Sequence, residues 1–376
     1  MTFSFQRLFY VLSSIAIFIA LLFYGKTLLV PITTGLLISF ILYPAVKKVE
    51  RLRVGRIGSI SLVMIVVTLI TVATGIVLSS QIIRITADFD DFFNKMIQLI
   101  NSVVTFFNKE VAFTPDVKTQ TILTGIKNYF TDSGLFIVSD TLSVTGTFLS
   151  WCLLSLIYTF LILLYRKSFV NALVGFVSEE NKDQFYNMLQ GIQKVGQQYV
   201  SGMIALILLL GVLNTTALSI IGIDYAFFFG FLAALLTIIP YIGTSLGGLF
   251  PTIYAFLNYD SYWYPAGVVL AFWFIQTLEG NFLSPKIIGG KLDLNAFTSI
   301  IALILGALIW GVPGMILFLP FTATFKIICD YYKPLEPLGI LMGDPETNKS
   351  KKSKLTLSKI IDQLNSKIQR RSSENH

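Results

Sequence analysis

Long apolar stretches alternate with short polar segments along this 376-residue chain. Crossing the roughly 30 Å hydrocarbon core of a bilayer takes about 20 helical residues. Six stretches are clear candidates for such a helix: residues 8–23, 28–46, 57–79, 147–165, 200–221 and 263–282. The pattern therefore predicts an all-α fold, a polytopic transmembrane helical protein.

Two further apolar runs, residues 226–257 and 296–329, are too long for one simple crossing. A straight helix of either length would extend about 45 to 50 Å. Helix breakers interrupt both runs, as "PYIGTSLGGLFP" at residues 240–251 and "LGALIWGVPGMILFLP" at residues 305–320. In lipid, broken backbone needs shielding by protein or by a water-filled cavity. We expect two long interrupted helices, each either a re-entrant hairpin or a single broken crossing.

Lysine and arginine predict the orientation. The loop at residues 47–56 holds five basic side chains against the single acid Glu50, whereas the first loop offers only Lys26. This bias places the N-terminus in the cytoplasm and residues 81–146 outside. Hairpins would bring Lys286 and Lys291 to the cytoplasmic side, so the charge rule favours them over single crossings. In both layouts the Lys-rich tail is cytoplasmic.

The pattern divides the chain into five segments. They are three N-terminal spans (1–80), an external amphipathic helical segment (81–146), two spans with a cytoplasmic amphipathic helix (147–221), a core with the interrupted helices (222–333) and a basic cytoplasmic tail (334–376). The cytoplasmic amphipathic helix is expected at residues 181–199, where apolar side chains recur at helical spacing. Plain packing of these amphipathic helices is favoured over a sensing role.

Composition supports the membrane class and excludes several chemistries. Hydrophobic residues make up 54% and charged residues 13%, against about 25% charged in soluble domains. Cys152 and Cys329 stand singly and His376 is the only histidine, so no metal site or Ser/His/Asp relay can be assembled. The net charge of +7 fits attraction to anionic membrane lipids better than binding of nucleic acid. We expect no cofactor, no metal, no nucleic acid and no enzymatic activity.

Polar side chains inside the span at residues 263–282 are candidates for function. Gln276, Glu279 and Asn281 follow one another in "QTLEGNFLSP", which Pro285 closes. An ionisable group at membrane depth normally faces the protein interior and marks a pathway or a proton site. Alternatively, Glu279 lies near the interface and pairs with Lys286 about two turns on. The sequence leaves both interpretations open.

Four motifs in the second half resemble the AI-2E family, the autoinducer-2 exporter type of bacterial transporter. They are "IPYIG", "QTLEGNFLSPKIIGGKL", "WGVPGMILFLPFTATFKI" and "PLEPLG", within residues 222–339. Two positions depart from the family pattern: Thr244 stands where proline is frequent, and Asn295 where histidine is common. The second departure removes support for a shared proton-handling role at that position.

The resemblance implies a multi-pass permease of the bacterial inner (cell) membrane, and the charge rule places both termini in the cytoplasm. Members are linked to autoinducer-2 export or to sodium/proton antiport. Carried over onto this chain, the family motifs indicate ten positions for binding of substrate or ion: Pro240, Tyr241, Gly243, Gln276, Glu279, Asn281, Pro285, Gly311, Gly314 and Pro320.

The leading hypothesis is a secondary transporter that exports a small polar solute, with autoinducer-2 as one candidate. A sodium/proton antiporter and a passive channel or membrane scaffold are the alternatives. The expected partners are membrane lipids, the small polar solute or a cation or proton, and further copies of the chain in a homo-oligomer.

Overall fold

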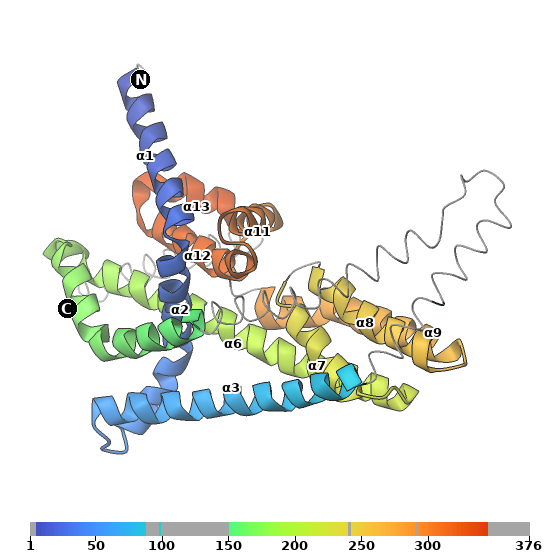
Figure 1. Cartoon of the computed structure of the whole chain (residues 1–376). Helices are drawn as coiled ribbons and strands as arrows, with labels where there is room; N and C mark the ends of the chain where they lie inside the picture. The colour runs from blue at the N-terminus through green and yellow to red at the C-terminus, as the bar shows by residue number, and fades with distance from the viewer. Residues whose placement is uncertain (1–4, 88–97, 99–149, 240–241, 290–291, 345–376) are drawn as a thin grey trace, which may run out of the picture. The chain divides into compact units, whose positions relative to one another are not determined.

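The computed structural model describes residues 5–87, 98, 150–239, 242–289 and 292–344. Within these residues the chain is helical and contains no strand (Figure 1). The α-helices are α1 (Phe5–Tyr24), α2 (Lys26–Glu50), α3 (Arg56–Ala87), the Ser150–Gly175 helix, α6 (Lys182–Ile221), α7 (Ala226–Leu236), α8 (Ile242–Asn258), α9 (Trp263–Leu278), α11 (Ala296–Trp310), α12 (Val312–Tyr331) and α13 (Glu336–Met342). The predicted all-α class is confirmed.

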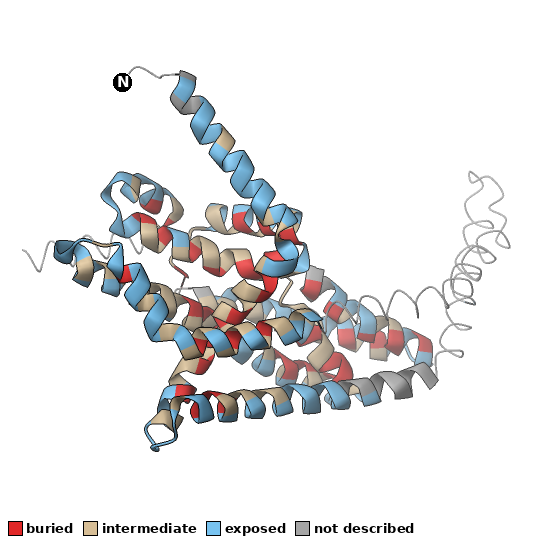
Figure 2. Cartoon of the chain, turned by 60° about the vertical axis from the view of Figure 1, so that its left-hand side comes forward, coloured by how far each residue is buried: buried red, intermediate tan, exposed pale blue. Residues whose placement is uncertain are grey.

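Six helices of the described residues are long and apolar enough to cross a membrane: Lys26–Glu50, Arg56–Val77, Ser150–Gly175, Glu179–Ile221, Trp263–Ile288 and Val312–Tyr331. Five of them overlap predicted spans, and the sixth is the second half of the second long run. The first predicted span lies in α1, where the apolar helix Phe9–Tyr24 is shorter than the other six. Figure 2 shows α1 and α3 as largely exposed, as expected for helices whose apolar side chains face lipid.

Both long runs are interrupted, as predicted. The first run forms α7 and α8, of 11 and 17 residues, and the second forms α11 and α12, of 15 and 20 residues. At about 1.5 Å per residue, α7 is only about 16 Å long and cannot cross a bilayer by itself. The two helices of each run contact one another, which is the arrangement expected of a hairpin.

The described chain divides into two compact units. Unit 1 comprises residues 1–166 and 200–287, and unit 2 comprises residues 167–199 and 288–376. One hydrophobic core of unit 1 joins the end of α6 to α7, α8 and α9 around buried Leu218, Phe229, Tyr254 and Val268. A second core joins α2, α3 and the Ser150–Gly175 helix.

Polar contacts fix the second core at its basic end. Arg166 donates two hydrogen bonds to the Glu50 carboxylate, at 2.6 and 2.8 Å, and Arg56 donates to the Leu163 carbonyl at 3.3 Å. The end of α2, the start of α3 and the Ser150–Gly175 helix therefore meet at one end of unit 1. The charge rule had assigned these segments to the same side of the membrane.

Unit 2 is built around the α11–α12 hairpin. Gly311 links the two helices with a backbone φ of +65°, a left-handed conformation that favours glycine. Gly306 and Gly314 then face one another so closely that a Cβ on either would collide with the backbone of the other. The indole of Trp310 meets the Phe318 ring edge-on, with ring centroids 5.4 Å apart. Small residues thus hold the hairpin closed.

The predicted cytoplasmic amphipathic helix is not a separate element. Residues 182–199 form the first half of α6, which continues without a break into the fifth predicted span. Gln184 donates to the Tyr331 carbonyl at 3.2 Å, and the buried Tyr199 hydroxyl donates to the Ile316 carbonyl at 3.3 Å. This half of α6 therefore packs on α12, in agreement with the expectation that its apolar side serves packing.

Two further boundaries differ from the sequence prediction. Pro285 does not close its helix, because π-helical turns at Glu279–Leu283 and Pro285–Gly289 carry the chain past it. α3 runs on to Ala87, eight residues beyond the predicted end at residue 79. The predicted external amphipathic helix lies almost wholly at residues 88–97 and 99–149, outside the described part of the chain.

Candidate functional site

A small polar cavity lies within unit 1, where α6, α7, α8 and α9 meet. Its polar side chains are Asn214 from α6, Thr237 at the end of α7, and Gln276 and Glu279 from the end of α9. Apolar groups complete the wall: Leu210, Ala233, Gly247, Phe272 and Ile275. Its volume of about 20 Å³ has room for one water molecule.

Asn214 is the most deeply buried polar group of this cavity. Only 4% of the residue is exposed, and its Oδ1 has no hydrogen-bond partner among the described residues. A buried amide oxygen without a partner destabilises a fold by about 1 to 3 kcal/mol. An acceptor kept in this state is suited to a donor or cation that enters the cavity, such as water, a solute hydroxyl or a metal cation.

Glu279 closes the other side of the cavity. It follows directly after α9, at the start of the π-helical turn Glu279–Leu283, and Ser284 hydrogen-bonds its carboxylate. The ion pairs found among the described residues do not join Glu279 to Lys286. Glu279 lines the polar cavity, and the alternative of a pair with Lys286 is not what the structure shows. π-Helical turns inside α-helices occur frequently at functional sites.

Close helix contacts bring these side chains together. Gly247 of α8 lies against Ala233 of α7, where an added Cβ would come within 2.9 Å of the alanine Cβ. One turn earlier, a Cβ on Gly243 would collide with the Leu236 carbonyl at the end of α7. Gly243 and Gly247, four residues apart, therefore act as a pair of small residues that allows close helix contact. Gly243 contributes packing beside the cavity rather than a group that lines it.

The other predicted positions of unit 1 have different surroundings. Asn281 is exposed, and its Nδ2 donates to the Thr277 carbonyl of the preceding turn at 2.9 Å. Pro285 is also exposed, in the π-helical segment. Neither lines the cavity. Pro240 and Tyr241 lie outside the described residues.

Three predicted positions belong to unit 2. Gly311 makes the turn between α11 and α12, Gly314 makes the close contact with Gly306, and Pro320 is buried within α12. Each has a structural role in the hairpin. Their predicted part in binding stays a prediction.

Two polar groups escaped the sequence interpretation. Asn214 begins "NTT", the one polar triplet within the span at residues 200–221. This triplet could have marked Asn214 as a candidate for the site. Lys326 lies inside the second long run with a side chain only 2% exposed. Its Nζ contacts Asp293 at 3.0 Å and Asp330 at 2.7 Å. A lone lysine in an apolar run indicates a buried ion pair, because an unpaired charge there would be too costly.

Asn295 has a structural role in this protein. Its Oδ1 accepts a hydrogen bond from the Thr298 amide at 2.8 Å and caps α11. Its Nδ2 donates to the carbonyls of Leu341 and Gly343, at 2.6 and 3.2 Å. The segment after α13 is thereby tied to the start of α11, within unit 2. The first residues of the predicted tail are thus part of a packed unit.

Comparison with known proteins agrees with this architecture. Residues 12–334 match the model of the AI-2E family transporter group. The chain belongs to the AI-2E transporter family. Two Bacillus subtilis (strain 168) proteins whose names class them with transport proteins, YrrI and YueF, are 30% and 34% identical over 134 and 128 residues. The AI-2 transport protein TqsA of Escherichia coli (strain K12) is 28% identical over 140 residues.

These pairwise matches are partial. They cover 36%, 34% and 37% of this chain and 37%, 34% and 40% of YrrI, YueF and TqsA. The family assignment thus comes from the family-wide match, and the names of the relatives describe those proteins alone.

Proposed function

We propose that this protein is a secondary transporter that exports a small polar solute through the membrane, with the cavity of Asn214, Gln276 and Glu279 as part of its pathway. The carrying observation is that an unpartnered amide oxygen, a second amide and a carboxylate line one cavity and belong to two helices long and apolar enough to cross a membrane. Such groups are costly in lipid and normally mark a substrate or ion route. Family membership and the transport names of the relatives support the same function.

The size of the cavity favours a gated pathway over an open channel, and family membership favours a transporter over a scaffold. A volume of about 20 Å³ admits one water molecule but not a polyol. A solute can therefore enter only if α7, α8 or α9 moves, which is the behaviour of interrupted helices in alternating-access transporters. The name of TqsA makes autoinducer-2 the first solute to test. A membrane-embedded enzyme is disfavoured, since the one hydroxyl that lines the cavity, that of Thr237, donates to the Ala234 carbonyl at 2.6 Å and not to a base.

Reconstituted protein tests the proposal directly. Proteoliposomes loaded with labelled autoinducer-2 should release it faster than protein-free vesicles, and Gln276→Leu should lower that rate at least about tenfold because the solute loses a hydrogen bond to the cavity wall. Thr277→Val is the matched control, since Thr277 is exposed on the same helix and does not line the cavity. Equal rates for the two variants would exclude the cavity from the pathway.

Coupling is tested at Glu279 in the same vesicles. A carboxylate that exchanges a proton or cation with the cavity makes solute release depend on an ion gradient. We expect Glu279→Gln to remove that dependence. A pH-sensitive dye in parallel vesicles detects sodium/proton exchange, the activity expected if the protein is an antiporter. Gradient-dependent release that persists in Glu279→Gln would assign coupling to another group.

A further inference from the structure

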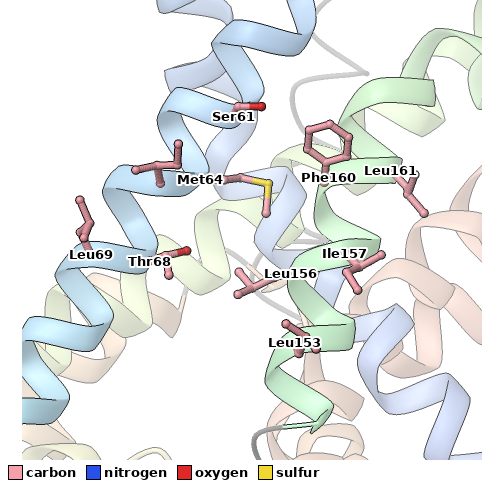
Figure 3. Close-up of a pocket in the computed structure, with 10 residues that line it drawn as sticks. Ser61, Met64, Thr68, Leu69, Leu153, Leu156, Ile157, Phe160 and Leu161 are labelled. Carbon is pink, nitrogen blue, oxygen red and sulfur yellow. The ribbon is translucent and has the colours of Figure 1, made fainter.

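An apolar groove opens between α3 and the Ser150–Gly175 helix, within unit 1 (Figure 3). It has a volume of about 490 Å³, comparable to sites that hold small ligands. Its walls are almost entirely aliphatic and aromatic: Ser61, Met64, Ile65, Thr68 and Leu69 from α3 face Leu153, Leu156, Ile157, Phe160 and Leu161. Both walls belong to helices long and apolar enough to cross a membrane.

Large side chains of the groove are uncovered by the rest of the protein. Ile65 is 56% exposed, Leu69 62% and Leu153 61%. Along the apolar window of α3 only 6% of residues are buried. Because this surface lies at membrane depth, its natural occupant is an acyl chain.

One end of the groove lies beside a cluster of basic residues. Arg56 donates to the carbonyl of Leu163, two residues from the groove residue Leu161. On α3, Arg56 precedes the groove residue Ser61 by five residues, or about 7.5 Å along the helix. The last turn of α2 and the loop that follows it add the exposed side chains of Lys47, Lys48, Arg51 and Arg53.

The carboxylate in this cluster is already engaged. Glu50, the single acid of residues 47–56, accepts two hydrogen bonds from Arg166. The exposed basic side chains of the loop thus keep a positive charge that an anion can neutralise. Lysine and arginine at a membrane surface attract anionic lipid head groups by about 1 kcal/mol each.

We propose that this groove and its basic end form a binding site for an anionic phospholipid, with an acyl chain along α3 and the phosphate at Arg53 and its neighbours. A second copy of the chain fits less well. It would bring the same positive cluster to an already positive end, and helix contacts in membranes favour small residues rather than leucine, isoleucine and phenylalanine. The proposal is independent of what the protein transports.

Short-range fluorescence quenching in liposomes tests the site with the full chain. Ile65→Trp places a reporter in the groove, and Ile70→Trp is the matched control, because Ile70 is 61% exposed on the same helix outside it. Fluorescence of the unaltered protein supplies the background of its four native tryptophans. The probes are phosphatidylglycerol and phosphatidylcholine, each brominated on its acyl chains and diluted into ordinary phosphatidylcholine.

Brominated phosphatidylglycerol should quench Ile65→Trp at about a tenfold lower mole fraction than brominated phosphatidylcholine does, because the basic residues favour the anionic lipid. Ile70→Trp should respond equally to both lipids. Adding Arg51→Gln and Arg53→Gln to Ile65→Trp should abolish the preference. Leu69→Trp, also an exposed groove position, repeats the test if Ile65→Trp does not fold.

Two results would overturn the proposal. Equal quenching of the groove reporter by both lipids means that the groove takes any acyl chain without selecting a head group. Absence of quenching by either lipid, together with cross-linking between cysteines at Ile65 of two copies, assigns the groove to an interface between protein chains.

Discussion

Asn214 combines deep burial with an unused hydrogen-bond acceptor, and it does so beside the carboxylate of Glu279. A structural polar residue normally finds its partner within the fold, as Thr159 does by donating to the carbonyls of Ser155 and Gly35, at 2.7 and 3.2 Å. A polar group that waits for a ligand lowers the stability of the fold while the ligand is absent. We therefore expect stability and transport to respond to Asn214 in opposite directions.

Replacing Asn214 by leucine should stabilise the protein by about 1 kcal/mol, because a buried acceptor without a partner is removed. The same variant should lose at least about tenfold in solute release, because a hydrogen-bonding group of the cavity is gone. Thermal unfolding in detergent and flux from proteoliposomes measure the two effects. Thr216→Val, at an exposed position of the same helix, is the control and should change neither. Transport at the rate of the unaltered protein would remove Asn214 from the pathway.

Lys326 of unit 2 is also a deeply buried polar residue, but its charge is paired with Asp293 and Asp330. Lys326→Met should destabilise the protein by about 3 kcal/mol, because Asp293 and Asp330 lose the cation between them. Neutralising both acids as well, with Asp293→Asn and Asp330→Asn, should recover most of that loss. Chemical unfolding of the three forms gives the comparison. An unfolding transition unmoved in Lys326→Met would show that the cluster contributes nothing to stability.

At the scale of elements, small residues decide where helices meet. The α7–α8 pair closes at Gly243 and Gly247, and the α11–α12 pair closes at Gly306 and Gly314. The sequence predicted both interruptions, because helix breakers occur within apolar runs that are too long for one crossing. The four-residue spacing of Gly243 and Gly247 is typical of close helix contact. It could not assign partners such as Leu236 and Ala233, which depend on how the hairpin folds back.

Gly314→Ala tests the closed hairpin. The added methyl would collide with the Gly306 backbone, so α11 and α12 must separate, at a cost of about 1 to 3 kcal/mol. Gly75→Ala is the control, since Gly75 of α3 has open space where the methyl would go and alanine favours a helix by up to about 1 kcal/mol. Thermal unfolding should therefore move in opposite directions for the two variants. A Gly314→Ala variant as stable as the unaltered protein would show that the two helices are not in this contact.

At the scale of the whole molecule, the distribution of charge makes a prediction about the ends of the chain. The basic loop at residues 47–56 and the Lys-rich tail should both face the cytoplasm. A green fluorescent protein fused to the C-terminus should fluoresce in bacterial cells. Alkaline phosphatase at the same position should stay inactive, because its disulfides do not form in the cytoplasm. Active phosphatase would reverse the orientation.

The sequence by itself determined the class, the spans and the two interruptions. Each follows from one requirement: backbone polar groups in lipid must be paired within the segment. The length of an apolar run and the helix breakers inside it can therefore be identified from the sequence alone. It also drew attention to Gln276 and Glu279, because polar residues in an apolar run are conspicuous. The sequence did not predict the full length of α6, because the first half of this helix is stabilised by packing on α12. It also did not predict where the tail begins, because that depends on the hydrogen bonds of Asn295 to Leu341 and Gly343.

The tertiary structure alone decided which polar groups meet. Asn214 and Glu279 line one cavity, and Lys326 contacts Asp293, only because helix packing fixes the rotation of each helix about its axis. That rotation depends on contacts between segments far apart in the sequence, such as Arg56 with Leu163. Hydropathy places a residue along the membrane normal, but packing decides whether its side chain faces lipid, a neighbouring helix or a cavity.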